Sequence, residues 1–188
     1  MPLLSIGLVS ATALAYEVLL MRLFSIIQWH HFAYMMISLA LLGYGVSGAF
    51  LMLLQRPLLQ RFAASYVINL ALFGITAVGC FLLAQHLPFN AEEVLWDIRQ
   101  TVWLMCTYLL LAVPFFFAAN AIGLALIHYR ARLSRIYAAD LLGAGLGSIG
   151  VLALLFVVLP LQALTVLGLS LIHISEPTRP TRASRMPS

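Results

Sequence analysis

Long apolar runs without Asp, Glu, Lys or Arg dominate the chain. Four of them are uninterrupted, and a fifth, at the N-terminus, is long enough only when it includes Glu17. A helix needs about 20 apolar residues to cross the hydrocarbon core, so each run is long enough to cross once and too short to cross twice. The pattern therefore predicts an all-α, polytopic membrane protein with five transmembrane helices, near residues 3–26, 32–55, 63–86, 101–128 and 141–167.

The composition supports the prediction of a membrane protein and limits the class of partner that we expect. Hydrophobic residues make up 63% of the 188 residues and charged residues 9%, against about 25% charged in a soluble domain. That balance excludes a soluble enzyme, a disordered tail and a disulfide scaffold. The net charge is +4, but the arginines form no dense patch, so the expected partner is the lipid bilayer and not nucleic acid.

The predicted connections differ in the sign of their charge. Arg56 and Arg61 separate the second and third spans, and three arginines separate the fourth and fifth, whereas the 87–100 loop is acidic. Arginine-rich short loops stay in the cytoplasm. We therefore expect a cytoplasmic N-terminus in a multi-pass protein, in a bacterial inner membrane.

The last twenty residues do not read as native protein. Residues 169–179 resemble an in-frame translation of a transposase sequencing adapter, and residues 184–188 resemble its continuation. Such segments belong outside fold reasoning. We expect 169–188 to be a non-native, disordered tail after a transmembrane domain that covers 1–168, and the chain to be an N-terminal fragment that lacks further C-terminal spans.

Glu17 is the most informative polar residue, because an ionisable group inside a span costs a few kcal/mol and faces a partner or a cavity. It shares a helix face with Ser10 and Ala13. Arg22 is placed to reach the outer interface and to compensate the carboxylate. Two interpretations remain open for Glu17: an ion or proton relay, and a neutral carboxyl group hydrogen-bonded to the second span through Tyr34 or Ser38.

Other polar residues in the spans have structural explanations. Asn69 and Asn120 are expected at similar depth, where their amides would clasp the third and fourth spans together. His31 is expected at the interface without a metal, since no ligand stands at suitable spacing. Asp140 suits the N-cap of the fifth helix.

Small residues four apart predict close helix–helix contacts, at Gly43 and Ser47 on the second span and at Gly143 and Gly147 on the fifth. The stretch 145–150 matches G-x-G-x-x-G, but no strand precedes it, so it predicts no dinucleotide site. We expect no catalytic, cofactor-binding or metal-binding residue in this chain.

Four stretches together resemble the N-terminal membrane region of the membrane-bound spermidine synthase-like proteins. They are 14–25 (LAYEVLLMRLFS), 31–45 (HFAYMMISLALLGYG), 114–117 (PFFF) and 135–147 (RIYAADLLGAGLG). In that family a membrane region precedes a soluble, aminopropyltransferase-like domain that uses decarboxylated S-adenosylmethionine or a related donor. The resemblance implies that Glu17, Arg22, His31, Tyr137 and Asp140 occupy the family's polar membrane positions. No motif of the soluble domain occurs here.

Two functions follow from these observations. The first is a membrane-embedding module of a spermidine synthase-like protein whose catalytic domain is missing from this fragment, so that the parent and not the fragment would be the transferase. The alternative is a fragment of a small-molecule transporter or channel that uses Glu17 in the membrane. The proline that kinks the fourth span and the glycine-rich helices are features that such proteins also have.

Overall fold

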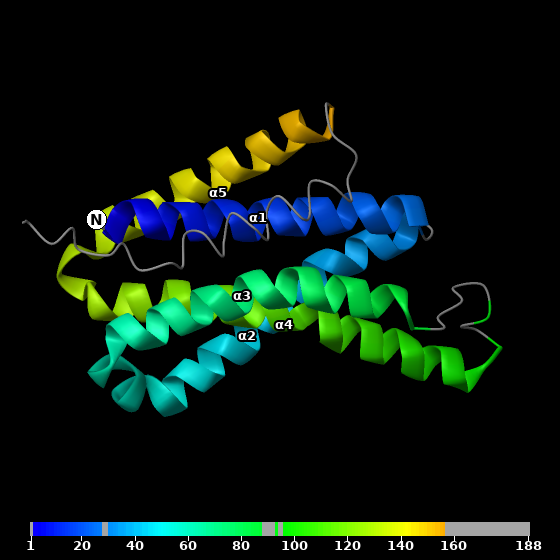
Figure 1. Ribbon diagram of the computed structural model, residues 1–188, viewed down its shortest axis with the longest axis horizontal. Helices are drawn as coiled ribbons and strands as arrows, with labels where there is room; N and C mark the ends of the chain where they lie inside the picture. The colour runs from blue at the N-terminus through cyan, green and yellow to red at the C-terminus, as the bar shows by residue number, and fades with distance from the viewer. Residues whose placement is uncertain (1, 28–29, 88–92, 94–95, 157–188) are drawn as a thin grey trace, which may run out of the picture.

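A computed structural model describes residues 2–27, 30–87, 93 and 96–156 of the chain (Figure 1). It contains the helices α1 (Pro2–Ile27), α2 (His30–Gln60), α3 (Phe62–Gln85), α4 (Ile98–His128) and α5 (Leu133–Leu155), with a short 3-10 turn, η2 (Arg130–Arg132), before α5. Within these described ranges, five helices are long and apolar enough to cross a membrane. The all-helical, five-span prediction is therefore confirmed, and the protein is a multi-pass membrane protein.

Helix boundaries depart from the expected spans mainly at α2 and α5. Helix α2 continues through Arg56 and Pro57 to Gln60, and α5 begins at Leu133 instead of residue 141. The hydropathy of the sequence marks where a helix leaves the hydrocarbon core of the membrane. The helix itself continues into the interface for as long as its residues can keep the helical backbone hydrogen bonds. The expected end of the fifth span and the tail at 169–188 lie outside the described residues.

The early start of α5 corrects the interpretation of Asp140. This residue lies seven positions into the helix, so it is not the N-cap; the residue that precedes the helix is Arg132, which makes no side-chain capping bond. At 1.5 Å per residue, Asp140 lies about 10 Å along the axis from the first residue of α5. A capping aspartate does occur before α4, where Asp97 accepts a hydrogen bond of 2.9 Å from the backbone N–H of Arg99.

Helix α4 runs through the centre of the bundle and packs against α3, α2 and α1 (Figure 1). Its buried positions recur along most of its length and include Leu111, Phe115, Ala118 and Leu124, none of which is exposed. Small and large side chains alternate along this face, which lets neighbouring helices approach at the alanines and interlock at the leucines and phenylalanines. The core therefore forms around α4.

Three aromatic rings connect α1, α3 and α4 at the middle of the core. The ring of Tyr16 lies 5.3 Å from that of Phe115 and 6.3 Å from that of Phe73, the latter edge to face. Such pairs stabilise by about 0.5–1.5 kcal/mol beyond the area they bury. Tyr16 is one of the largest fully buried side chains, at 1% exposure.

The remaining apolar surface faces outward. Met52 and Leu53 on α2 are more than 80% exposed, and Leu146 on α5 is 69% exposed. In a soluble protein such residues would be costly, but lipid tails are as apolar as the side chains they contact. These faces are therefore the surface of the protein toward the bilayer.

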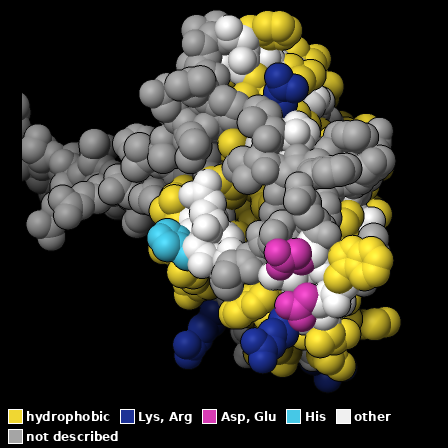
Figure 2. Space-filling view, turned by 90° about the vertical axis from the view of Figure 1, so that its right-hand side faces the viewer, with side chains coloured by type: hydrophobic (Ala, Val, Ile, Leu, Met, Phe, Trp, Pro, Cys, Tyr) yellow, Lys and Arg dark blue, Asp and Glu magenta, His cyan; other side chains and the backbone are white. Residues whose placement is uncertain are grey.

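Charged residues gather at the two ends of the bundle. The end formed by the α2–α3 turn and by η2 carries exposed Arg61, Arg130 and Arg132. The opposite end carries Glu93 and Asp97 beside Arg99. Figure 2 looks onto this second end, where acidic side chains lie beside hydrophobic ones. The separation of sign along the bundle axis is what the connections in the sequence predict.

Candidate functional site

The closest helix contact joins α1 to α5, and two polar side chains meet within it. The hydroxyl of Ser10 donates a hydrogen bond to Oδ1 of Asp140 and lies 3.0 Å from the carbonyl oxygen of Ile6 on its own helix. Ser10 is buried at 3% exposure, and Asp140 is half-buried. A carboxylate inside a membrane helix is costly unless it has a partner. Ser10 supplies that partner from another helix.

Small residues allow this approach. A Cβ atom added to Gly143 would lie 2.6 Å from Cα of Gly7, and one added to Gly147 would lie 2.5 Å from Cα of Ala11. Both obstacles are backbone atoms, which cannot swing away as a side chain can. The two backbones are therefore in direct contact, as in other small-xxx-small pairs of membrane helices.

Tyr44 of α2 extends the polar group around this contact. Its side chain lies within electrostatic range of the carboxyl groups of both Asp140 and Glu17. Its ring packs edge to face on Phe115, with 6.0 Å between centroids. We call Ser10, Asp140, Tyr44 and Glu17 the polar cluster; within it, the described structure shows a hydrogen bond only between Ser10 and Asp140.

Glu17 is half-buried on α1. Among the described side chains, it accepts no hydrogen bond and forms no ion pair, either with Arg22 or with any other residue. Of the two donors expected from the second span, Ser38 is exposed and makes no such bond, and the side chain of Tyr34 lies outside what the structure describes. The expected hydrogen bond from Glu17 to the second span is therefore wrong for Ser38, and for Tyr34 it stays a prediction.

The expected pairing of the two asparagines is also wrong. Asn120 of α4 accepts a buried 2.7 Å hydrogen bond from the hydroxyl of Ser47 on α2. Asn69 instead donates its amide to the carbonyl of Ser65, one turn back on its own helix, at 2.8 Å. Similar depth in the membrane does not establish that two side chains pair, because depth does not say which face of α4 each neighbouring helix meets.

Gly43 lies one turn before Ser47, at the same contact between α2 and α4. A Cβ atom there would meet the carbonyl oxygen of Ala112 at 2.8 Å and Cβ of Phe115 at 2.7 Å. Gly45, two positions on, has no atom within 4 Å of such a Cβ. The predicted contact at Gly43 and Ser47 therefore faces α4, whereas Gly45 faces outward.

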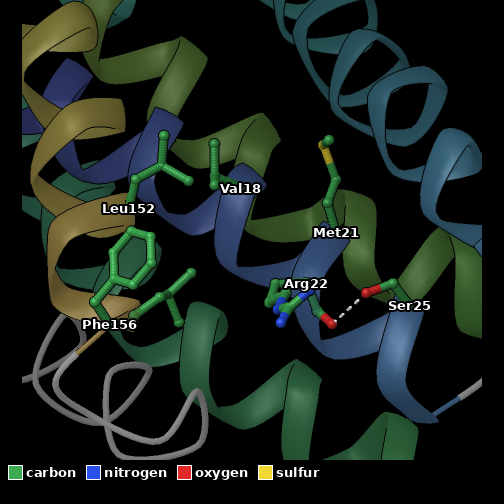
Figure 3. Close-up of a pocket in the computed structure, with 7 residues that line it drawn as sticks. Val18, Met21, Arg22, Ser25, Leu152 and Phe156 are labelled. Atoms are coloured by element: carbon green, nitrogen blue, oxygen red, sulfur yellow. Dashed lines mark hydrogen bonds between the residues drawn. The ribbon is translucent and has the colours of Figure 1, made fainter.

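Arg22 is exposed on α1 and lines a groove between α1 and α5 (Figure 3). The groove has a volume of about 530 Å³. Its other α1 residues are Val18, Met21 and Ser25; Leu152 and Leu155 of α5 and Phe156, which directly follows that helix, form the other side. The Ser25 hydroxyl donates to the carbonyl oxygen of Arg22 at 2.7 Å, so its hydrogen is used within the helix.

Other candidates carry no site in the described part of the chain. His31 lies at the start of α2, but its side chain is outside what the structure describes. Within the described ranges, no three His, Cys, Asp or Glu side chains come together as metal ligands. Cys80 is buried and Cys106 exposed, and neither forms a disulfide.

Two tyrosines were missed by the sequence analysis. Tyr44 belongs to the polar cluster, and Tyr16 is buried with a hydroxyl that has no partner in the described structure. Aromatic residues are common in membrane helices, so neither stood out. No local pattern singles out Tyr16, because adjacent positions on a helix point to different sides and its neighbour Glu17 therefore does not indicate that it is buried.

No family model, curated protein or solved structure matches this chain. Its function must therefore be inferred from its own residues and their arrangement.

Proposed function

We propose that this five-helix bundle is the membrane-embedding module of a larger spermidine synthase-like protein. The observation that carries the proposal is that the stretches resembling that family supply interior contacts. Tyr16 lies in the core, as does Phe115, while Asp140, Gly143 and Gly147 hold α5 against α1. Motifs made of packing residues are what an anchor needs, because its role is to hold a defined shape in lipid.

The module would place the rest of the protein at the membrane surface. A cytoplasmic N-terminus follows from the arginines at the α2–α3 turn and at η2, and we assign the protein to a bacterial inner membrane. The proposed soluble domain, with decarboxylated S-adenosylmethionine as its co-substrate, would lie in the part of the protein beyond these helices. The bundle itself contributes position and stability to that domain.

The direct test is a long-read sequence of the genomic locus beyond the codon for Gly168. Continuation through further spans into a nucleoside-binding, aminopropyltransferase-like domain is the expected result. A reading frame that contains only more spans and a stop codon would refute the anchor. Genomic DNA that encodes residues 173–188 would refute the adapter origin of the tail.

Orientation is tested by labelling single cysteines in intact cells, in a background without Cys80 and Cys106. A membrane-impermeant maleimide should label Trp96→Cys, which is 89% exposed at the acidic end, and spare Arg132→Cys at the basic end. Both should react after permeabilisation. The reverse pattern in intact cells would place the N-terminus outside.

A transporter or channel is the second candidate, and Glu17 is the observation in its favour. A half-buried carboxyl group that lacks a described partner and lies near Tyr44 is what a cation or proton relay requires. Glu17→Gln in the full chain, reconstituted in vesicles, separates the two functions. Loss of a proton or cation flux with unchanged folding would favour transport, with exposed Glu93→Gln as the control; no flux in the unsubstituted protein would favour the anchor.

A further inference from the structure

The groove beside Arg22 is a consequence of how α1 and α5 cross. The two helices run in the same direction, because Gly7 meets Gly143 and Ala11 meets Gly147. They touch at these small residues and then separate toward their C-terminal ends (Figure 1). Two straight helices that are in backbone contact at one level cannot stay in contact at another if they cross at an angle. The space that opens is the groove.

The wall of the groove is apolar and faces the bilayer. Val18 and Met21 of α1 and Leu152 and Leu155 of α5 line the groove with hydrocarbon. Leu152 is 51% exposed, so the groove is open at its side and not sealed within the bundle. A volume of 530 Å³ lies in the range of sites that hold small ligands. In the membrane, the molecules that surround this apolar groove are lipids, and their hydrocarbon chains can fill it.

Arg22 adds a fixed positive charge to the groove. The guanidinium stays protonated and binds phosphate through paired N–H donors. Within the described residues it forms no ion pair, and its side chain is exposed. It lies five residues before the end of α1, about 8 Å along the axis, which places it near the level of lipid headgroups.

We propose that this groove binds one anionic phospholipid, with the phosphate at the guanidinium of Arg22 and an acyl chain along Val18, Leu152 and Leu155. The positive charge of Arg22 favours an anionic headgroup. The narrow space between the diverging helices α1 and α5 favours an acyl chain over a bulkier hydrophobic group. The site holds whether or not a catalytic domain follows the bundle, because only α1 and α5 build it.

The test is a titration of the detergent-purified full chain with phosphatidylglycerol or phosphatidylcholine, with bound lipid counted by native mass spectrometry. The unsubstituted protein should bind one phosphatidylglycerol in preference to phosphatidylcholine. Arg22→Gln should weaken phosphatidylglycerol binding at least tenfold and abolish the preference. Leu152→Trp, which fills the groove and keeps the charge, should weaken binding of both lipids.

Matched controls remove the same charge or add the same bulk elsewhere. Arg56→Gln, on α2, and Leu146→Trp, on the exposed face of α5, should bind both lipids as the unsubstituted protein does. The proposal is overturned if Arg22→Gln equals Arg56→Gln, or if Leu152→Trp equals Leu146→Trp. It is also overturned if the unsubstituted full chain binds neither lipid, as it would if the groove were already filled. Arg22→Lys keeps the charge and should retain part of the preference even if Arg22→Gln fails to fold.

Discussion

Replacing Gly143 by alanine tests the backbone contact between α1 and α5 most directly. The new methyl carbon would lie 2.6 Å from Cα of Gly7 and closer still to its carbonyl oxygen, where ordinary contact begins near 3.4 Å, so the helices must separate by at least about 0.8 Å or bend. Overpacking of this kind costs about 1–3 kcal/mol. Separation would also stretch the hydrogen bond from Ser10 to Asp140, which lies in the same contact.

Gly145→Ala is the matched control, because a Cβ atom there meets nothing within 4 Å. Both substitutions gain the same helix propensity, up to about 1 kcal/mol for alanine over glycine. The difference between the two variants therefore isolates the steric cost. We expect Gly143→Ala to have a free energy of unfolding about 1–3 kcal/mol lower than that of Gly145→Ala.

The assay is unfolding of the full chain in mixed micelles by titration with sodium dodecyl sulfate, followed by far-ultraviolet circular dichroism. Each variant is compared at equal protein and detergent concentration. Equal free energies of unfolding for the two alanine variants would refute the backbone contact, and with it the origin of the groove beside Arg22. A Gly143→Ala variant more stable than Gly145→Ala would do so even more directly.

Three further features, two hydrogen bonds and one buried hydroxyl, are tested in the same unfolding assay. Ser10→Ala leaves the Asp140 carboxylate without its donor and should lower the free energy of unfolding by about 1–3 kcal/mol. In an Asp140→Asn background, the same substitution should cause a smaller loss. Equal losses in the two backgrounds would argue against the hydrogen bond. Ser47→Ala and Asn120→Ala should show a coupling energy of about 0.6 kcal/mol, up to roughly 2, in a double-mutant cycle, and strict additivity would contradict their contact. Tyr16→Phe removes a buried hydroxyl that has no described partner, so stability should stay the same or rise by about 1 kcal/mol; a clear loss would mean that the hydroxyl has a partner.

The number of spans and their approximate positions were determined by the sequence alone. Crossing hydrocarbon requires a local run of about 20 apolar residues with its backbone hydrogen bonds satisfied within the helix, so the signal is contained in each segment. The same locality explains why glycines four apart, such as Gly143 and Gly147, already indicate a close helix contact. The separation of Arg61 and Asp97 to opposite ends also follows from their order along the chain.

Which helix meets which was decided only by the tertiary structure. In water, the buried face of a helix differs from its exposed face in polarity, but in a membrane both lipid and protein interior are apolar. Hydropathy therefore could not say that Asn120 faces Ser47 instead of Asn69. Nor could it say that Asp140 lies within a helix and is tolerated there because Ser10, 130 positions earlier in the chain, donates to it. Partners that distant in sequence are set by the geometry of packing, which no local pattern contains.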